Sequence, residues 1–139
     1  MSHDHVRPAA TTSKVVEGHP RWPSREATLV GSKGQVVCER CYVADRAFRR
    51  VRGLIGWRRL TPGEGMLLRP TWSIHTAFMR FPIDAVFLDR HLTMLAIKPR
   101  LKPWRVAWRW RAHSVLELPA GTCDELGLRA GDKLGWGWV

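Results

Sequence analysis

Two apolar runs that meet at a proline constrain the fold of this chain more than any other feature of its 139 residues. The first run, over residues 74–81, alternates between two faces, which predicts a strand buried on at least one side. Pro82 interrupts this run because proline has no N–H to donate to a sheet. The second run, over residues 83–88, is apolar except for Asp84 and predicts a second buried strand. Two strands joined at a proline corner are the simplest interpretation.

Further short apolar runs, bounded by glycine, proline and polar residues, predict a mainly β domain. These predicted strands lie at residues 27–30, 35–42, 66–68, 92–97, 104–111, 113–118 and 133–139. Apolar residues at three- and four-residue spacing predict one short helix over residues 45–55, and residues 122–126 are predicted to form a helical turn. Residues 1–26 lack apolar periodicity, so we expect a disordered tail before a single β-rich domain over residues 27–139.

Five motifs follow one another in this domain, and they are RGLIG at 52–56, GEGMLL at 63–68, FMRFPIDAVFLD at 78–89, VLELPAG at 115–121 and GLRAGDKL at 127–134. In order and spacing they resemble the motifs of the domain of unknown function 192 family, also called uncharacterised protein family 0127. The resemblance implies a compact domain of jelly-roll or barrel type with a short helix or two, and it implies no established activity. The positions that match the most recognisable motifs are Arg52, Gly53, Glu64, Gly65, Met66, Met79, Arg80, Pro82, Asp84, Glu117, Gly131 and Asp132.

The chain carries a net charge of +11, and two segments concentrate its basic residues. Residues 46–59 contain six arginines and no acid, and residues 98–111 contain six lysines or arginines and no acid. Such density favours anionic partners such as nucleic acid, acidic protein or anionic lipid, and it also suits a surface that serves solubility alone. In the nucleic-acid alternative, the predicted contact residues are Arg46, Arg49, Arg50, Arg105, Arg109, Arg111 and Trp108.

Within the second basic segment, residues 104–111 read WRVAWRWR. This alternation predicts a strand with one aromatic face and one cationic face. We expect the aromatic face to be core, because tryptophans in regular alternation are typical of a half-buried strand. Exposed tryptophans would instead suit base stacking or a lipid interface.

Polar residues embedded in apolar strands or tight turns are the candidates for a site. They are Glu64, His75, Arg80, Asp84 and Glu117. A buried charge is costly unless it is paired, so we expect Arg80 to contact Asp84 or Glu64. Such a contact would either fix the proline corner or form part of a site for a small anionic or polar ligand at one end of the barrel. The predicted ligand-binding residues are Arg80, Asp84, Glu64, His75 and Arg52.

Cys38 and Cys41 have the C-x-x-C spacing of a redox motif or of half a zinc site. Residues three apart on a strand point to opposite faces, and Cys123 alone does not supply a second ligand pair. We therefore expect buried or idle thiols, no metal site and no other cofactor. An odd number of cysteines fits a reducing compartment.

Sequence support for catalysis is weak, because the chain has no glycine-rich phosphate loop, no H-E-x-x-H motif and no nucleophile elbow. An enzyme with acid or histidine chemistry at Glu64, His75 and Asp84 stays an alternative. No apolar run is long enough to span a membrane and none forms a signal peptide, so we expect a cytoplasmic protein. The favoured interpretation is a non-catalytic binding or accessory module for a small polar or anionic ligand or for a protein partner.

Overall fold

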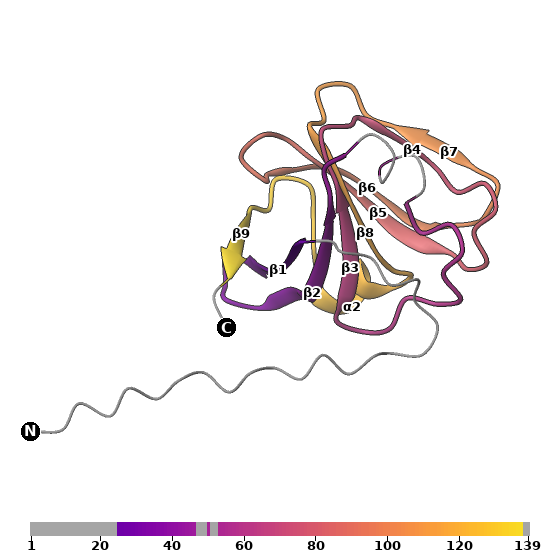
Figure 1. The fold of residues 1–139 in the computed structure, drawn as a ribbon. Helices are drawn as coiled ribbons and strands as arrows, with labels where there is room; N and C mark the ends of the chain where they lie inside the picture. Colours follow the sequence, from indigo (N-terminus) through magenta and orange to yellow (C-terminus); the bar gives the residue numbers. More distant parts are fainter. Residues whose placement is uncertain (1–24, 47–49, 51–52, 138–139) are drawn as a thin grey trace, which may run out of the picture.

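The computed structural model describes residues 25–46, 50 and 53–137, and these residues form one mainly β domain (Figure 1). The strands are β1 (Arg25–Gly31), β2 (Val36–Ala44), β3 (Glu64–Leu68), β4 (Ser73–His75), β5 (Ile83–Leu88), β6 (Met94–Leu101), β7 (Val106–Trp108), β8 (Ser114–Pro119) and β9 (Leu134–Gly137). A short helix near the C-terminus, α2, covers Thr122–Leu126. The prediction of a mainly β single domain with a helical turn at this place is confirmed.

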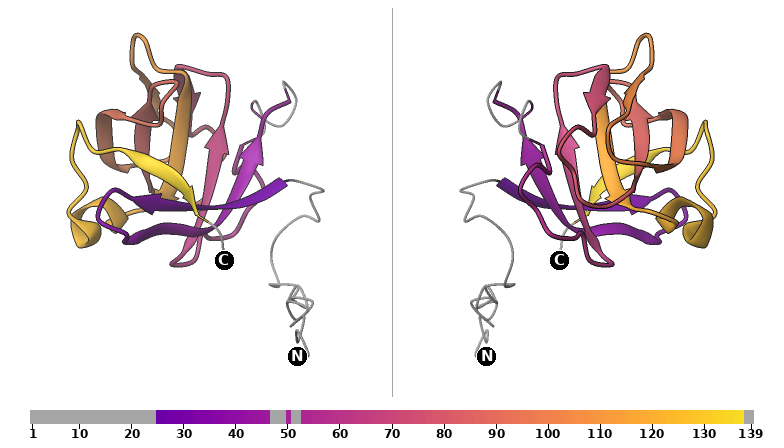
Figure 2. Two further views of the ribbon diagram at one scale, coloured as in Figure 1. Left: turned by 90° about the vertical axis from the view of Figure 1, so that its left-hand side faces the viewer. Right: turned by 90° about the vertical axis from the view of Figure 1, so that its right-hand side faces the viewer.

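Seven of the strands form one curled sheet, a half-barrel, in the order β6-β5-β8-β3-β2-β1-β9 (Figures 1 and 2). Neighbouring strands in this sheet are antiparallel except for β2 and β3, which are parallel. A bridge between Thr93 and Lys133, and a 2.8 Å bond from the Met94 amide to the Asp132 carbonyl, join the two edges at one corner. The remaining strands, β4 and β7, form a separate two-stranded ribbon.

The central strands of the sheet are buried on both faces, and successive side chains enter two different clusters. The helix-side core, which includes residues of α2, contains among others Leu29, Val86, Leu116, Leu118 and Cys123. The ribbon-side core, which is covered by β4 and β7, contains among others Met66, Ile74, Phe87, Ala107 and Val115. The sheet therefore has two interiors, and the face to which a residue points decides which one it enters.

Gly65 allows β3 to lie tightly between its neighbours. A Cβ atom at this position would lie 2.8 Å from the Cys38 Sγ and 3.0 Å from the backbone oxygen of Glu117. Any larger residue would push β3 away from β8, which explains a glycine inside an otherwise apolar strand.

The proline corner differs in part from the prediction. Strand β5 forms as expected and is buried along its whole length, whereas the strand predicted over residues 74–81 ends at His75. Directly after β4, the Thr76 hydroxyl donates to the Lys102 carbonyl at 2.7 Å and accepts from the Arg105 amide at 2.8 Å, so this side chain bonds to the segment before β7. Phe78 then adopts a left-handed conformation with φ of 62°.

The prediction that the tryptophans of residues 104–111 form core is wrong. Only residues 106–108 form a strand, and Trp104, Trp108 and Trp110 are 60%, 63% and 75% exposed. The small Ala107 points inward instead, opposite Ile74 of β4. Alternation is present in β7, but the face that it buries is the one without the aromatic rings.

Two predictions fall largely outside the described part of the chain. Of the tail expected over residues 1–26, only residues 25–26 are described, and they begin β1. The helix expected over residues 45–55 includes residues 47–49 and 51–52, which are not described. Of this helix, the described residues show one backbone bond, from the Arg50 amide to the Arg46 carbonyl at 3.0 Å. Among the described residues, no helix is long and apolar enough to cross a membrane.

Candidate functional site

A cavity of about 390 Å³ opens on the ribbon side of the sheet. It lies between Arg50 and residues 53–55, the end of β3 and the ribbon, and most of its wall is apolar. Its polar lining residues are Arg50, Thr71, Ser73, His75 and Glu117. His75 and Val106, which are both exposed, mark the place where the cavity reaches solvent. An apolar cavity of this size with a few polar groups is typical of a small-molecule site.

Glu117 is the buried acid of this cavity. It lies on β8 between Met66 of β3 and Ala85 of β5, so its side chain points to the ribbon side of the sheet. The residue is 2% exposed, and within the described part of the chain its Oε2 has no hydrogen-bond partner. Burial raises the pKa of this carboxyl group to about 8. At neutral pH the group is therefore mostly protonated and offers an O–H donor to the cavity.

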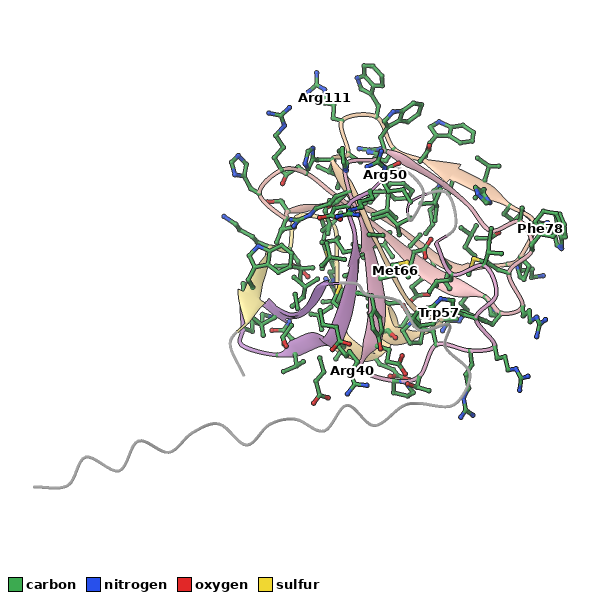
Figure 3. The ribbon with its side chains drawn as sticks, in the orientation of Figure 1. Arg40, Arg50, Trp57, Met66, Phe78 and Arg111 are labelled. Atoms are coloured by element: carbon green, nitrogen blue, oxygen red, sulfur yellow. The ribbon has the colours of Figure 1, made fainter. Side chains whose placement is uncertain are left out.

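Arg50 supplies a cation to the same cavity. Its Nη1 donates to the carbonyl of Asp45 at 3.0 Å and to that of Arg69 at 3.4 Å, and these bonds hold the side chain in place. Figure 3 shows Arg50 at the end of the β2–β3 pair that lies nearer the ribbon, with Arg40 at the opposite end. The guanidinium carries further N–H donors that a ligand can use.

Gly53 brings backbone close to the buried acid. It is in the left-handed region, with φ of 49°, which glycine adopts without strain. A Cβ atom there would lie 3.8 Å from Leu68 Cδ2 and 4.0 Å from the Oε2 of Glu117. The turn at residues 53–56 thus lies close to the carboxyl group of Glu117.

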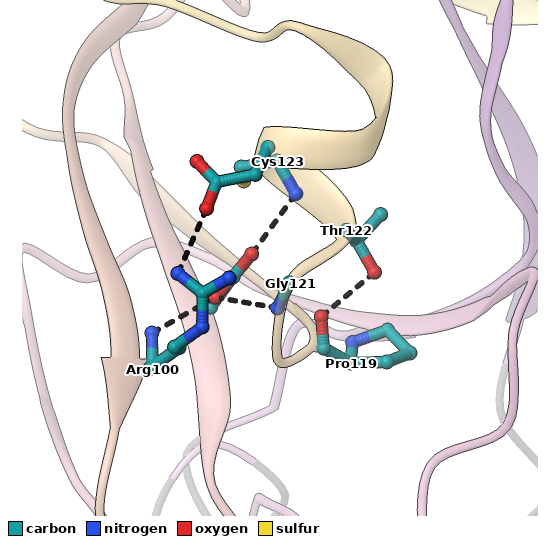
Figure 4. Close-up of polar contacts among 7 residues, drawn as sticks. Arg100, Pro119, Gly121, Thr122 and Cys123 are labelled. Carbon is teal, nitrogen blue, oxygen red and sulfur yellow. Dashed lines mark hydrogen bonds and ion pairs between the residues drawn. The ribbon is translucent and has the colours of Figure 1, made fainter.

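Asp84 does not reach this cavity. It is fully buried on β5 but pairs with Leu118, so it faces the helix side of the sheet. Its Oδ1 accepts from the amides of Arg100 at 2.9 Å and Gly121 at 3.2 Å, and its Oδ2 accepts from the amide of Cys123 at 2.9 Å (Figure 4). Through these bonds Asp84 holds α2 and β6 against β5.

The predicted contact between Arg80 and Asp84 or Glu64 is not formed. Arg80 is exposed, and it takes part in none of the ion pairs found among residues 25–46, 50 and 53–137. The physical reason is that three backbone amides already occupy the carboxylate of Asp84, so this buried charge needs no guanidinium. Asp84 is buried as expected, but its partners are backbone amides and not Arg80.

Glu64 lies at the start of β3, about 13 Å along the strand from Leu68 at the cavity end. It is buried, and its Oε1 accepts a hydrogen bond from the Thr61 hydroxyl. Burial and, to a smaller extent, the charge of Glu64 raise the pKa of the nearby Tyr42 hydroxyl. The predicted cluster of Glu64, His75 and Asp84 is therefore divided among three places, and only His75 lines the cavity.

The residues predicted for the two binding alternatives are also divided. Arg52 and Arg49 lie outside the described part of the chain. Arg46 is exposed at the end of β2, while Arg50 belongs to the cavity wall. The remaining candidates for nucleic acid are exposed and lie on or next to the ribbon, and they are Arg105, Trp108, Arg109 and Arg111.

The orientation of Cys38 and Cys41 differs from the prediction. Cys38 and Cys41 do not point to opposite faces, because both are fully buried in the helix-side core. The pairing of β1 with β2 is irregular between Ala27 and Leu29, which returns both thiols to one face. A hydrogen bond with Cys38 and, to a smaller extent, burial raise the pKa of the Cys41 thiol. Within the described residues, no group of three or more His, Cys, Asp or Glu is arranged to hold a metal ion.

Sequence reasoning identified Glu117 as an embedded acid but did not assign it to the site, and it placed Arg50 only in the nucleic-acid alternative. The available signal was that Glu117 is the sole charged residue among the apolar residues of β8. What was missing is the packing of Arg50, residues 53–55 and the ribbon around Glu117, which leaves a cavity there.

Relatives of this chain share its sequence and its fold. The chain is 35% identical over 114 residues to a UPF0127 protein of Thermococcus sibiricus, covering 76% of this chain and 71% of the relative. It is 31% identical over 101 residues to a UPF0127 protein of Pyrococcus abyssi, covering 68% and 83%.

Two solved structures resemble the domain. A proposed transcription regulator of Sinorhizobium meliloti matches with a TM-score of 0.74 at 24% identity, covering 86% of this chain and 98% of that one. A protein of unknown function from Novosphingobium aromaticivorans matches with a TM-score of 0.73 at 23% identity, covering 86% and 91%. At these identities the likeness establishes the half-barrel fold alone. The family model of DUF192, described as an uncharacterized family, matches residues 28–136, and together with the UPF0127 relatives it shows that this chain belongs to the DUF192 family.

Proposed function

We propose that this protein binds a small polar molecule, without catalysis, in the cavity on the ribbon side of its sheet. The observation that carries the proposal is Glu117, whose buried Oε2 meets no hydrogen-bond partner among the described residues. A buried polar group in this condition costs about 1–3 kcal/mol. A ligand that accepts a hydrogen bond from the carboxyl group removes that cost, so binding and stability are linked at this residue.

The lining residues indicate the chemistry of the ligand. The protonated carboxyl group of Glu117 suits a carbonyl or hydroxyl oxygen at the inner end of the cavity. The guanidinium of Arg50 suits a carboxylate or phosphate. Small oxo- or hydroxycarboxylates and phosphate esters combine both groups, and molecules of this size fit a volume of about 390 Å³.

Of the residues predicted from the sequence, His75 lines the mouth of this cavity and belongs to the proposal. Arg52 precedes Gly53 of the cavity wall in the chain and stays a predicted ligand-binding residue on that ground. Arg80, Asp84 and Glu64 do not line the cavity and are not part of the proposal.

The test is saturation-transfer NMR on the full chain, with pyruvate, lactate, succinate and glycerol phosphate as probes. We expect at least one probe to bind at pH 7, and its affinity to fall above about pH 8 as Glu117 loses its proton. Arg50→Ala should weaken binding by about ten-fold or more, because it removes a charged hydrogen-bond donor.

Arg129→Ala is the matched control, because Arg129 is exposed, follows α2 and does not line the cavity. It should leave binding unchanged. Equal binding to wild type, Arg50→Ala and Glu117→Gln would contradict the cavity as the site. Failure of every probe to bind wild type would contradict the ligand class.

A further inference from the structure

The outer surface of the β4–β7 ribbon exposes an unusual set of large apolar side chains. This surface, here called the ribbon face, consists of Trp72, Phe78, Trp104, Val106, Trp108 and Trp110. Each of these residues is between 52% and 75% exposed. Aromatic side chains usually gain stability by burial, so a contiguous group of exposed rings is typical of an interaction surface.

The rings are grouped in pairs at the two ends of the ribbon. Trp72 and Trp110 meet edge to face with ring centroids 6.5 Å apart, and Phe78 and Trp104 do so at 4.6 Å. Trp108 lies between the pairs and is paired in register with Ser73. Edge-to-face contacts orient the rings against one another and leave ring faces open to a partner.

Backbone bonds hold both ends of the ribbon face in place. At one end the Arg109 amide donates to the Trp72 carbonyl at 2.9 Å, and at the other the Trp104 amide donates to the Thr76 carbonyl at 3.0 Å. Phe78 and Trp104 both have a left-handed backbone, with φ of 62° and 63°, which is rare for bulky residues. The rings are therefore displayed on an ordered frame, which reduces the entropy lost on binding.

The charges next to the ribbon face in the chain indicate the partner. The three tryptophans of residues 104–111 are each followed directly by an exposed arginine, and these arginines are Arg105, Arg109 and Arg111. Residues 98–111 contain six basic residues and no acid. A complementary partner therefore carries regularly spaced negative charges together with flat apolar groups.

We propose that the ribbon face binds single-stranded nucleic acid, with bases stacked on the exposed rings and phosphates held by the arginines. Stacking on aromatic side chains next to a basic track is how proteins bind single strands without a sequence preference. A duplex keeps its bases stacked inside and offers only phosphates. A membrane would have to take up the guanidinium groups that alternate with the tryptophans, and charged groups insert into lipid at a cost.

The four tryptophans of the ribbon face do not line the cavity, whereas Val106 belongs to both, so a substitution at Trp108 tests this inference without changing the lining of the small-molecule site. Loss of one function leaves the other measurable with its own probe.

The test is fluorescence anisotropy of the full chain with labelled oligothymidylate and oligouridylate, compared with a duplex of equal length, over a range of salt concentrations. We expect the single strands to bind more tightly than the duplex, with quenching of tryptophan fluorescence and an affinity that falls steeply with salt. Trp108→Ala should weaken binding by about 5- to 100-fold. Arg109→Ala should reduce the slope of the salt dependence.

Trp136→Ala is the matched control, since Trp136 is an exposed tryptophan on β9, outside the ribbon face. It should bind single strands as wild type does. Both substituted tryptophans are exposed, and far-UV circular dichroism checks that each variant folds.

Three results would overturn the inference. The first is absence of single-strand binding by wild type. The second is binding that Trp108→Ala leaves unchanged or that the duplex matches, which would indicate electrostatic attraction alone. The third is tryptophan-dependent binding to vesicles containing phosphatidylserine without binding to the oligonucleotides, which would assign the ribbon face to a membrane surface.

Discussion

Asp84 and Glu117 are buried acids on neighbouring strands, but they face opposite sides of the same sheet. On the helix side, Asp84 accepts hydrogen bonds from three backbone amides. On the ribbon side, the Oε2 of Glu117 has no such bond within the described residues, and burial raises the pKa of the group to about 8. Burial alone therefore does not distinguish a structural acid from a binding one. What separates them is whether the fold itself supplies the partners.

The protonation of Glu117 makes the stability of the fold depend on pH. Between about pH 4.5 and pH 8, folded Glu117 keeps a proton that the unfolded chain releases. The folded state therefore binds more protons than the unfolded state in this range, and stability must fall as pH rises. Over the whole range the loss amounts to about 5 kcal/mol. A residue that lowers stability at neutral pH suggests a role other than folding.

The largest expected effect is that of Asp84→Ala. It should lower the free energy of unfolding by about 3–5 kcal/mol, because three amides lose their acceptor in the interior. Urea denaturation at pH 7 measures this change. Glu125→Ala, on the exposed side of α2, is the control and should change stability by less than about 0.5 kcal/mol. Equal effects of the two variants would mean that the bonds to Asp84 contribute little.

A smaller effect of opposite sign is expected for Glu117→Gln. Glutamine has nearly the same size but binds no proton, so the variant should be more stable than wild type at pH 7 by about 3 kcal/mol. The same denaturation experiment measures it, with Glu39→Gln on the surface of β2 as the control. Destabilisation by Glu117→Gln would place this acid in the same class as Asp84.

The smallest effect is expected for Arg100→Ala. The guanidinium of Arg100 pairs with Asp124 at 2.8 Å, but both side chains are exposed. The contact of this residue with Asp84 is made by its backbone amide, which the substitution keeps. The unfolding midpoint should stay within error of wild type. A loss comparable with that of Asp84→Ala would show that the side chain, and not the backbone, holds this corner.

The strands of the fold were largely predictable because they follow from local patterns. The apolar run at residues 83–88 gave β5, and the run at residues 113–118 gave β8 within one residue. These segments are buried on both faces, so no choice of face had to be made. In β7 only one face is buried, and the prediction chose the wrong one. The large tryptophans were expected in the core, but the small Ala107 is the buried residue.

The site was less predictable because its contacts join distant parts of the chain. The amides that bind Asp84 are 16, 37 and 39 residues away from it in sequence, and no local pattern reveals them. The hydroxyl of Thr76, the residue after β4, bonds to residues 26 and 29 positions away. Burial of an acid could be read from its apolar neighbours, but the identity of its partner could not.

The most direct test of the account is the pH dependence of unfolding for wild type and Glu117→Gln, measured by urea denaturation between about pH 5 and pH 9. The variant should gain stability over wild type by about 1.4 kcal/mol for each pH unit up to about pH 8, and the difference should be constant above it. A difference that stays constant from pH 5 to pH 8 would contradict it, because Glu117 would then titrate as it does in the unfolded chain.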